Sequence, residues 1–409
     1  MQAGHRHGEP SLSEIAREWG RIGCVGFGGP PAHIALLRAL CVQQHNWLTA
    51  ADFERAIAAT SLLPGPASTQ LAIYCGWRLR GTAGALVAGA GFIVPGLLAI
   101  VALSVLFLSG SPPAALRGAG AGAGAAVAAV AVSAGLGVAR PMWARTPRAA
   151  RPRTAVYALA GALAAAASVT WLVLVLLACG AAELLVRSRA RADAGTGAWL
   201  PTALLAAGSS GGRALGSRLG VLPLLGASAQ TGGPAALVWT AFKVGALAFG
   251  GGFVIVPLMQ ADAVDAYHWM THTQFVNAVA LGQVTPGPVT HTIAAVGYSA
   301  EGLAGAFLAA AVAFAPSFAF VLLGAARFER LLGDERVLAF LAGAAPAAAG
   351  AIIGAAVPLM GALEETWQFL VLGGAAIALL VLRRGVVPTL LLAGCAGLLV
   401  GLLDGPLPH

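Results

Sequence analysis

Long apolar runs separated by short polar or arginine-rich segments make up most of this chain. A helical run of about 20 residues crosses a hydrocarbon core ~30 Å thick, and most of these runs approach or exceed that length. The pattern predicts an all-α polytopic membrane protein with about 10–13 membrane segments. The runs lie at residues 82–108, 114–138, 154–186 (interpreted as two short limbs), 302–323, 337–361, 367–382 and 388–403.

The composition supports membrane residence. Hydrophobic residues make up 58% of the chain and charged residues 10%, and the mean hydropathy is +0.82, whereas soluble chains carry about 25% charged residues. The net charge of +8 comes from arginines at the ends of apolar runs, so we expect no nucleic-acid partner. The five cysteines stand singly, without metal-ligand spacing, and we expect no metal and no cofactor.

Two apolar segments are interrupted by the same tripeptide, Pro64-Gly65-Pro66 and Pro286-Gly287-Pro288. Proline removes a backbone donor and glycine relaxes the backbone, so each tripeptide breaks a helix. In a membrane such breaks occur where protein or a water-filled cavity satisfies the freed polar groups. A matched pair of broken helices in two halves points to the binding site of a transporter.

The second half of the chain repeats the first half 222 residues later. Phe249-Gly250-Gly251 repeats Phe27-Gly28-Gly29, and Lys243 repeats Arg21. After one deletion the spacing becomes 221, with Pro316 repeating Pro95. This duplication predicts three parts: an N-terminal repeat at residues 1–191, a linker at residues 192–235 rich in Gly, Ser, Pro and Ala, and a C-terminal repeat at residues 236–409.

The arginines indicate that the two repeats are inverted. Basic ends of one half correspond to ends without Lys or Arg in the other half, and arginine marks the cytoplasmic side. Since the linker has no apolar run of spanning length, we expect five crossings in each half, with one broken segment re-entrant. That count places the N-terminus outside, in conflict with Arg6, Arg17 and Arg21. The arginines that mark these basic ends are Arg78, Arg80, those from Arg140 to Arg153, Arg187, Arg189, Arg191, Arg327, Arg330, Arg336, Arg383 and Arg384.

These motifs resemble the chromate ion transporter family in its long form with two homologous halves. The resemblance rests on residues 27–33, 63–70, 249–252 and 283–288. It implies a secondary transporter that exports chromate, a sulfate-like oxyanion, across the bacterial inner membrane, driven by the proton motive force or by anion exchange. Two positions depart from the family pattern: Ala67 replaces a common asparagine, and Ala39-Leu40 replaces frequent acidic residues. The repeat counterpart of Leu40 is Asp262, so the acid is kept in one half only.

An oxyanion in a membrane site needs hydrogen-bond donors and positive potential. A broken helix provides both, because a helix N-terminus has free N–H groups and a partial positive charge. The alternative is a simple kink whose hydroxyls bond to their own helices. The candidate substrate-binding residues at the two breaks are Pro64, Gly65, Pro66, Ser68, Thr69, Gln70, Gln283, Thr285, Pro286, Gly287, Pro288, Thr290 and His291.

The remaining candidates lie near the two Phe-Gly-Gly motifs. Arg21 and Lys243 are candidate cations for the anion, and the alternative is that they extend to the lipid headgroups. His33 and His291 are candidates for proton coupling, or else packed hydrogen-bonding residues. The glycines allow close approach of an anion or close helix packing: Gly28, Gly29, Gly250 and Gly251.

Other functions were weighed against a carrier. The chain lacks HExxH and Walker motifs, which argues against a membrane enzyme. A channel or scaffold is the other alternative. Only a carrier concentrates its substrate against a gradient, so a measurement of substrate accumulation distinguishes the two. Within the carrier class, sulfate or another oxyanion and transport inward stay open, and so does the coupling partner, protons or a counter-anion.

Overall fold

The computed structural model describes residues 10–63, 65–108, 112–167, 169–194, 232–248, 253–324 and 334–408, and these contain helices and no strand. Within these residues, five helices are long and apolar enough to cross a membrane, and three shorter helices are also apolar. The protein is therefore an all-α polytopic membrane protein, as predicted. Pro64, Gly250, Gly251 and most of the predicted linker lie outside the described residues.

The first helix pair is a hairpin built around the Phe-Gly-Gly motif. Helix α1 (Leu12–Val25) ends before Gly26, and α2 (Gly29–Arg38) continues into the π-helical turn η1 (Ala39–Gln44). The chain returns alongside α1, because Trp47 stacks on Trp19 with ring centroids 6.3 Å apart. The motif thus forms the tip of a helical hairpin.

The second hairpin is built around the first Pro-Gly-Pro motif. Helix α3 (Ala50–Leu62) enters and α4 (Ala67–Phe107) leaves the tip. Asp52 Oδ1 in the first turn of α3 lies 3.6 Å from Arg78 Nη2, so the outer ends of the two helices meet. A hydrogen bond from the Thr49 hydroxyl, and then one from Arg55, lower the pKa of Asp52, so this carboxylate stays charged at neutral pH.

Helix α4 itself reverses direction between Ala67 and Phe107. Arg80 and Gly81 leave the helical conformation, and Gly81 has φ +57°. A methyl group built on Gly76 would lie against Gly84 across the reversal, so only glycine allows the two limbs to approach this closely. The limb from residue 67 to 79 closes the second hairpin, and the limb from residue 82 to 107 is long enough to cross the membrane.

The C-terminal half repeats both hairpins. The π-helical turn η1 has a counterpart in η6, and Asn46, which has positive φ, has a counterpart in His268. The chain reverses at Glu301-Gly302 within α13 as it does at Arg80-Gly81 within α4. The elements are α10 (Pro234–Leu247), α11 (Ile255–Gln260), η6 (Ala261–Ala266), α12 (His272–Val284), η7 (Val289–His291) and α13 (Thr292–Gly324).

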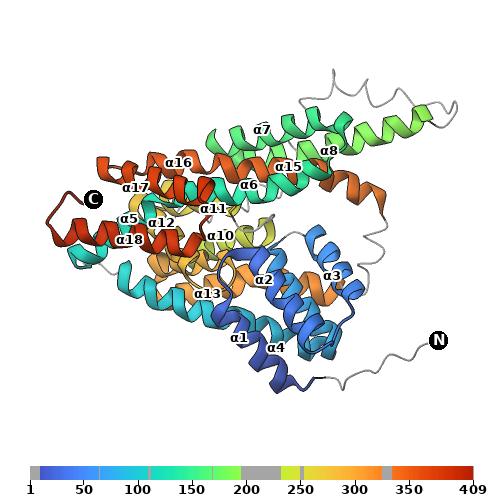
Figure 1. The fold of residues 1–409 in the computed structure, drawn as a ribbon, viewed down its shortest axis with the longest axis horizontal. Coiled ribbons are helices and arrows are strands. Elements are labelled where there is room, and N and C mark those ends of the chain that lie inside the picture. Colours follow the sequence, from blue (N-terminus) through green and yellow to red (C-terminus); the bar gives the residue numbers. More distant parts are fainter. Residues whose placement is uncertain are drawn as a thin grey trace.

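The other helices pack across the two halves. Helix α5 packs on α18 through glycines, and α15 packs on α7 and α8 (Figure 1). The bounds are α5 (Ala114–Ala125), α6 (Val127–Arg145), η2 (Arg148–Ala150), α7 (Arg151–Ala167), α8 (Val169–Ala194), α15 (Glu335–Gly354), α16 (Ala356–Gly361), α17 (Thr366–Ala376), η9 (Ile377–Val381) and α18 (Val386–Leu402).

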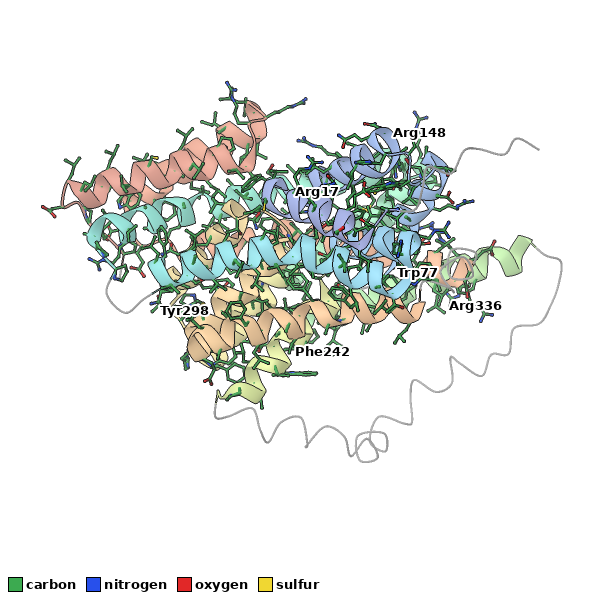
Figure 2. The ribbon with its side chains drawn as sticks, turned by 90° about the horizontal axis from the view of Figure 1, so that it is seen from below. Arg17, Trp77, Arg148, Phe242, Tyr298 and Arg336 are labelled. Atoms are coloured by element: carbon green, nitrogen blue, oxygen red, sulfur yellow. The ribbon has the colours of Figure 1, made fainter. Side chains whose placement is uncertain are left out.

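The hairpins of the two halves enter the molecule from opposite ends. Figure 2 shows Trp77, next to the reversal of α4, at one end and Tyr298, next to the reversal of α13, at the other. Arg148 and Arg336 lie at the Trp77 end. The inverted arrangement predicted from the arginines is therefore present in the fold.

The structure differs from the predicted topology in two details. Each half has two hairpins where a single re-entrant segment was expected, because the chain also turns back at Phe27-Gly28-Gly29 in the first half and between α10 and α11 in the second. The carbonyl of Pro10 accepts a hydrogen bond from Arg80 Nη1, so the described chain starts at the arginine-rich end. This placement favours the side that Arg17 and Arg21 indicated over the outside position derived from five crossings.

Candidate functional site

The tips of the hairpins from the two halves meet inside the protein. The N–H of Gly287 donates to the carbonyl of Gly26 over 2.8 Å, which joins the second Pro-Gly-Pro turn to the first Phe-Gly-Gly hairpin. A methyl group built on Gly65 would lie 3.4 Å from both the Gly245 carbonyl oxygen and Ser317 Oγ. Each Pro-Gly-Pro turn therefore packs against helices of the opposite half.

A cavity of about 330 Å³ opens beside the second Pro-Gly-Pro turn. Helix α6 forms one wall, and the start of α2 and the end of α12 form others. Five predicted site residues line it together: Gly28, Gly29, Gln283, Thr285 and Gly287. The other lining residues include Pro30, Pro31, Ser133, Val138, Phe253 and Val386.

The cavity offers neutral donors and a helix N-terminus. None of the described residues that line it carries a charge. Gln283 is buried and its Nε2 has no hydrogen-bond partner among the described residues, while the Thr285 hydroxyl donates weakly, over 3.4 Å, to the Gly282 carbonyl. Because α2 starts at Gly29, its positive end faces this space. Pro30 and Pro31 lack N–H groups, so the backbone donors there are those of Gly28 and Gly29.

The cavity lies toward the arginine-rich end of the molecule. Its lining residue Val138 precedes Arg140 by two positions in α6, and Val386 follows Arg384 by two positions. Neither Ser133 nor the α6 wall was predicted from the sequence. The only available signal was the run of small residues in this helix, which reads equally well as helix packing.

His33 and Ser68 meet, but behind the cavity. His33 Nε2 lies 2.8 Å from the Gly26 carbonyl and Nδ1 lies 3.2 Å from Ser68 Oγ. A carbonyl only accepts, so Nε2 carries the hydrogen and, in the neutral ring, Nδ1 accepts from the Ser68 hydroxyl. The ring is fully buried and packs edge-on against Phe92. His33 therefore ties the first hairpin tip to the start of α4.

His291 is packed behind the second Pro-Gly-Pro turn. Its ring is fully buried and lies edge-on to Phe314. Methyl groups built on Gly96 and Gly287 would lie 2.7 Å and 2.9 Å from His291 Cε1. The backbone of Ile93 and Pro286 lies close to the ring.

The two candidate cations form ion pairs away from the cavity. Arg21 Nε lies 3.1 Å from Glu18 Oε2, and half of the Arg21 side chain is exposed. Lys243 Nζ lies 2.5 Å from Asp262 Oδ2, which also accepts a hydrogen bond from Thr240 over 2.7 Å. Neither cation lines the cavity. The carboxylate partners were not anticipated, although the i,i+3 spacing of Glu18 and Arg21 was a usable signal.

The other predicted residues surround the tips. Thr69, Gln70 and Thr290 are buried outside the cavity lining, and the hydroxyls of Thr69 and Thr290 have no partner among the described residues. Pro66 and Pro288 precede α4 and η7 as N-caps, and the Pro286 carbonyl abuts Gly96. Pro64, Gly250 and Gly251 are in the part of the chain that is not described.

Comparison with known proteins identifies the family. The family model for Chromate transporter matches residues 13–184 and 235–401. The chain is 31% identical to a chromate transport protein of Cupriavidus metallidurans, over 100% of this chain and 97% of that protein. It is 32% identical to one of Pseudomonas aeruginosa, over 95% and 92%, and 26% identical to an uncharacterized transporter of Methanocaldococcus jannaschii, over 80% and 79%. No solved structure matches the chain. The chain belongs to the chromate transporter family.

Proposed function

We propose that this protein is a secondary transporter that exports chromate, or a similar tetrahedral oxyanion, across the bacterial inner membrane. The observation that carries the proposal is the cavity in which the start of α2 from one half meets the Pro-Gly-Pro turn of the other half. A binding site at the junction of two inverted repeats can be accessible first from one side of the membrane and then from the other as the two halves move.

The dimensions and the donors of the cavity suit a small anion. Its 330 Å³ corresponds to roughly ten waters at ~30 Å³ each, enough for a tetrahedral oxyanion with part of its hydration shell. The Gln283 amide, the Ser133 hydroxyl and the glycine N–H groups provide donors, and the α2 dipole provides positive potential. Because no fixed cation lines the cavity, the anion is held without a strong charge pair and can leave again.

Sulfate is the second candidate substrate. Sulfate and chromate share a tetrahedral shape and a double negative charge, and the neutral donors of the cavity do not distinguish between them. The two chromate transport proteins named above favour chromate.

The fold favours a carrier over an enzyme or a channel. The cavity lining contains no nucleophile paired with a base, and the opposite Pro-Gly-Pro turn is closed by packing around Gly65. A structure open at one turn and packed at the other is what alternating access requires.

The test is transport by everted membrane vesicles. We expect energised vesicles to accumulate radiolabelled chromate, with sulfate competing. A proton ionophore abolishes accumulation if the proton motive force drives export, whereas a trapped counter-anion sustains it if exchange does. Absence of chromate and sulfate movement in vesicles or proteoliposomes that contain folded protein would refute the proposed function.

A further inference from the structure

Buried hydroxyl groups in this protein differ in whether they have a hydrogen-bond partner. Most of them donate to a carbonyl of their own helix, as hydroxyls in membrane helices commonly do; Ser104 bonds to Ile100 over 2.8 Å and Thr60 to Ala56 over 2.9 Å. Three fully buried residues have hydroxyls without any partner among the described residues: Thr69, Thr290 and Ser317. An unpaired buried polar group costs about 1–3 kcal/mol, so it calls for a ligand or another compensation.

Ser317 lies at the first Pro-Gly-Pro turn. A methyl group built on Gly65 would be 3.4 Å from Ser317 Oγ and 2.5 Å from Gln70 Nε2. A hydroxyl from α13 of one half and an amide from α4 of the other half therefore approach the same glycine. We call these three residues the Gly65–Ser317 junction.

A helix N-terminus points into the same junction. The limb of α4 that starts at Ala67 has Pro66 as its N-cap, without a side-chain cap. Its first intrahelical bond runs from the Gln70 N–H to the Pro66 carbonyl, so the N–H groups of residues 67–69 have no helical acceptor. Ser68 and Thr69 are buried. Donors thus converge here from the backbone as well as from side chains.

The repeat shows why this place differs from its counterpart. Gly65 corresponds to Gly287, which lines the cavity, and Ser317 corresponds to Gly96. In the second half the His291 ring lies against both Gly96 and Gly287, whereas in the first half the Gln70 amide and the Ser317 hydroxyl lie against Gly65. The first half therefore has an amide and a hydroxyl at the glycine of the turn, where the second half has a packed imidazole ring.

We propose that the Gly65–Ser317 junction is a second oxyanion position, closed in this conformation, that takes up the tetrahedral anion when the carrier faces the other way. This proposal rests on the proposed function and adds a binding position to it. The ligand is a small oxyanion held by neutral donors: the Ser317 hydroxyl, the Gln70 amide and the free N–H groups at the start of α4.

The test compares Ser317→Ala with Ser104→Ala. Both serines are fully buried in corresponding long helices, but the Ser104 hydroxyl already bonds within its helix. Half-saturation for chromate is measured in everted and in right-side-out vesicles, which present opposite faces. We expect Ser317→Ala to raise the half-saturation concentration for chromate about 10-fold in right-side-out vesicles. In everted vesicles we expect no change, because the cavity at the arginine-rich end is unaltered. Ser104→Ala should leave half-saturation within about twofold of wild type in both kinds of vesicle.

A labelling measurement covers the case in which Ser317→Ala folds poorly. Ser317→Cys, in a background with Cys24→Ser and Cys395→Ser at the exposed cysteines, should react slowly with a soluble thiol reagent. Sulfate, which does not oxidise thiols, should change that rate by several-fold, and the same cysteine at position 104 should not respond.

The possible outcomes separate the two proposals. If wild-type protein moves chromate and Ser317→Ala behaves like Ser104→Ala, and sulfate leaves labelling at position 317 unchanged, the second position is refuted and the proposed function stands. If wild-type protein neither moves nor binds chromate or sulfate, both proposals fall.

Discussion

The two Pro-Gly-Pro turns share a backbone but differ in their surroundings. Gly65 and Gly287 both have positive φ, +120° and +93°, and each turn follows a 13-residue helix that begins after a capping threonine. The second turn borders a cavity, whereas the first is closed around Ser317 and Gln70. Duplication has preserved the turn, and divergent side chains have made one copy open and the other closed.

The paired cations show the same divergence. Arg21 and Lys243 occupy corresponding positions, and each is neutralised by one carboxylate. The carboxylates come from different places: Glu18 corresponds to Thr240, and Asp262 corresponds to Leu40. In both halves a carboxylate compensates the positive charge, but the two carboxylates stand at positions that do not correspond in the repeat. An uncompensated charge at membrane depth is costly, which explains why a partner is kept.

The largest effect is expected from Gly287→Ala. Alanine at φ +93° costs about 1–2 kcal/mol, and its methyl group would lie 2.9 Å from His291. We expect chromate transport in vesicles to be abolished. The control is Gly81→Ala, which also has positive φ but has nothing within 4 Å of the added methyl group; equal loss in both variants would mean that backbone strain alone decides the outcome.

Substitution of Gln283 tests the open turn next. Gln283→Leu removes an unpaired donor that lines the cavity, and a hydrogen bond to a charged group contributes about 1.5–3 kcal/mol. We expect half-saturation for chromate in everted vesicles to rise about 10-fold or more, with Gln283→Glu worse because it repels the anion. An unchanged value for Gln283→Leu would remove this residue from the binding site.

The cation pairs should differ in their contribution to stability. Asp262→Asn leaves a partly buried lysine without its partner, and we expect a loss of about 1–3 kcal/mol. Glu18→Gln should cost less than about 1 kcal/mol, since Arg21 is half exposed. Thermal unfolding in detergent measures both. Equal losses of stability in the two variants would contradict an effect of burial. If adding Leu40→Asp restores the stability that Glu18→Thr loses, the carboxylate positions of the two halves are interchangeable.

The smallest effect on transport is expected from His33→Gln. Both ring nitrogens of His33 are used in the neutral ring, by Gly26 and Ser68, so we expect a stability loss of about 1–2 kcal/mol and an unchanged pH profile of chromate transport. Transport rates from pH 5.5 to 8.5 in proteoliposomes provide the measurement. A flattened profile would instead assign proton coupling to His33.

Local features of the fold were predictable because they depend on covalent properties of single residues. Proline lacks an N–H and glycine tolerates positive φ, so the Pro-Gly-Pro breaks could be located from the sequence. Gly118 and Gly122 pack closely on Gly397, as small residues at helix contacts do. The first hairpin of each half was not foreseen, because Phe-Gly-Gly reads equally well as a packing motif.

The sequence by itself determined that the chain is an all-helical membrane protein, that it is duplicated and inverted, and that its family is that of the chromate transporters. Only the tertiary structure decided which turn borders a cavity, that Arg21 and Lys243 pair with carboxylates, and that His33 is tied to Gly26 and Ser68. The physical reason is that helix breaks and repeats are local in the chain. The open or closed state of a turn depends on residues far apart in sequence, such as His291 against Gly96 and Ser317 against Gly65.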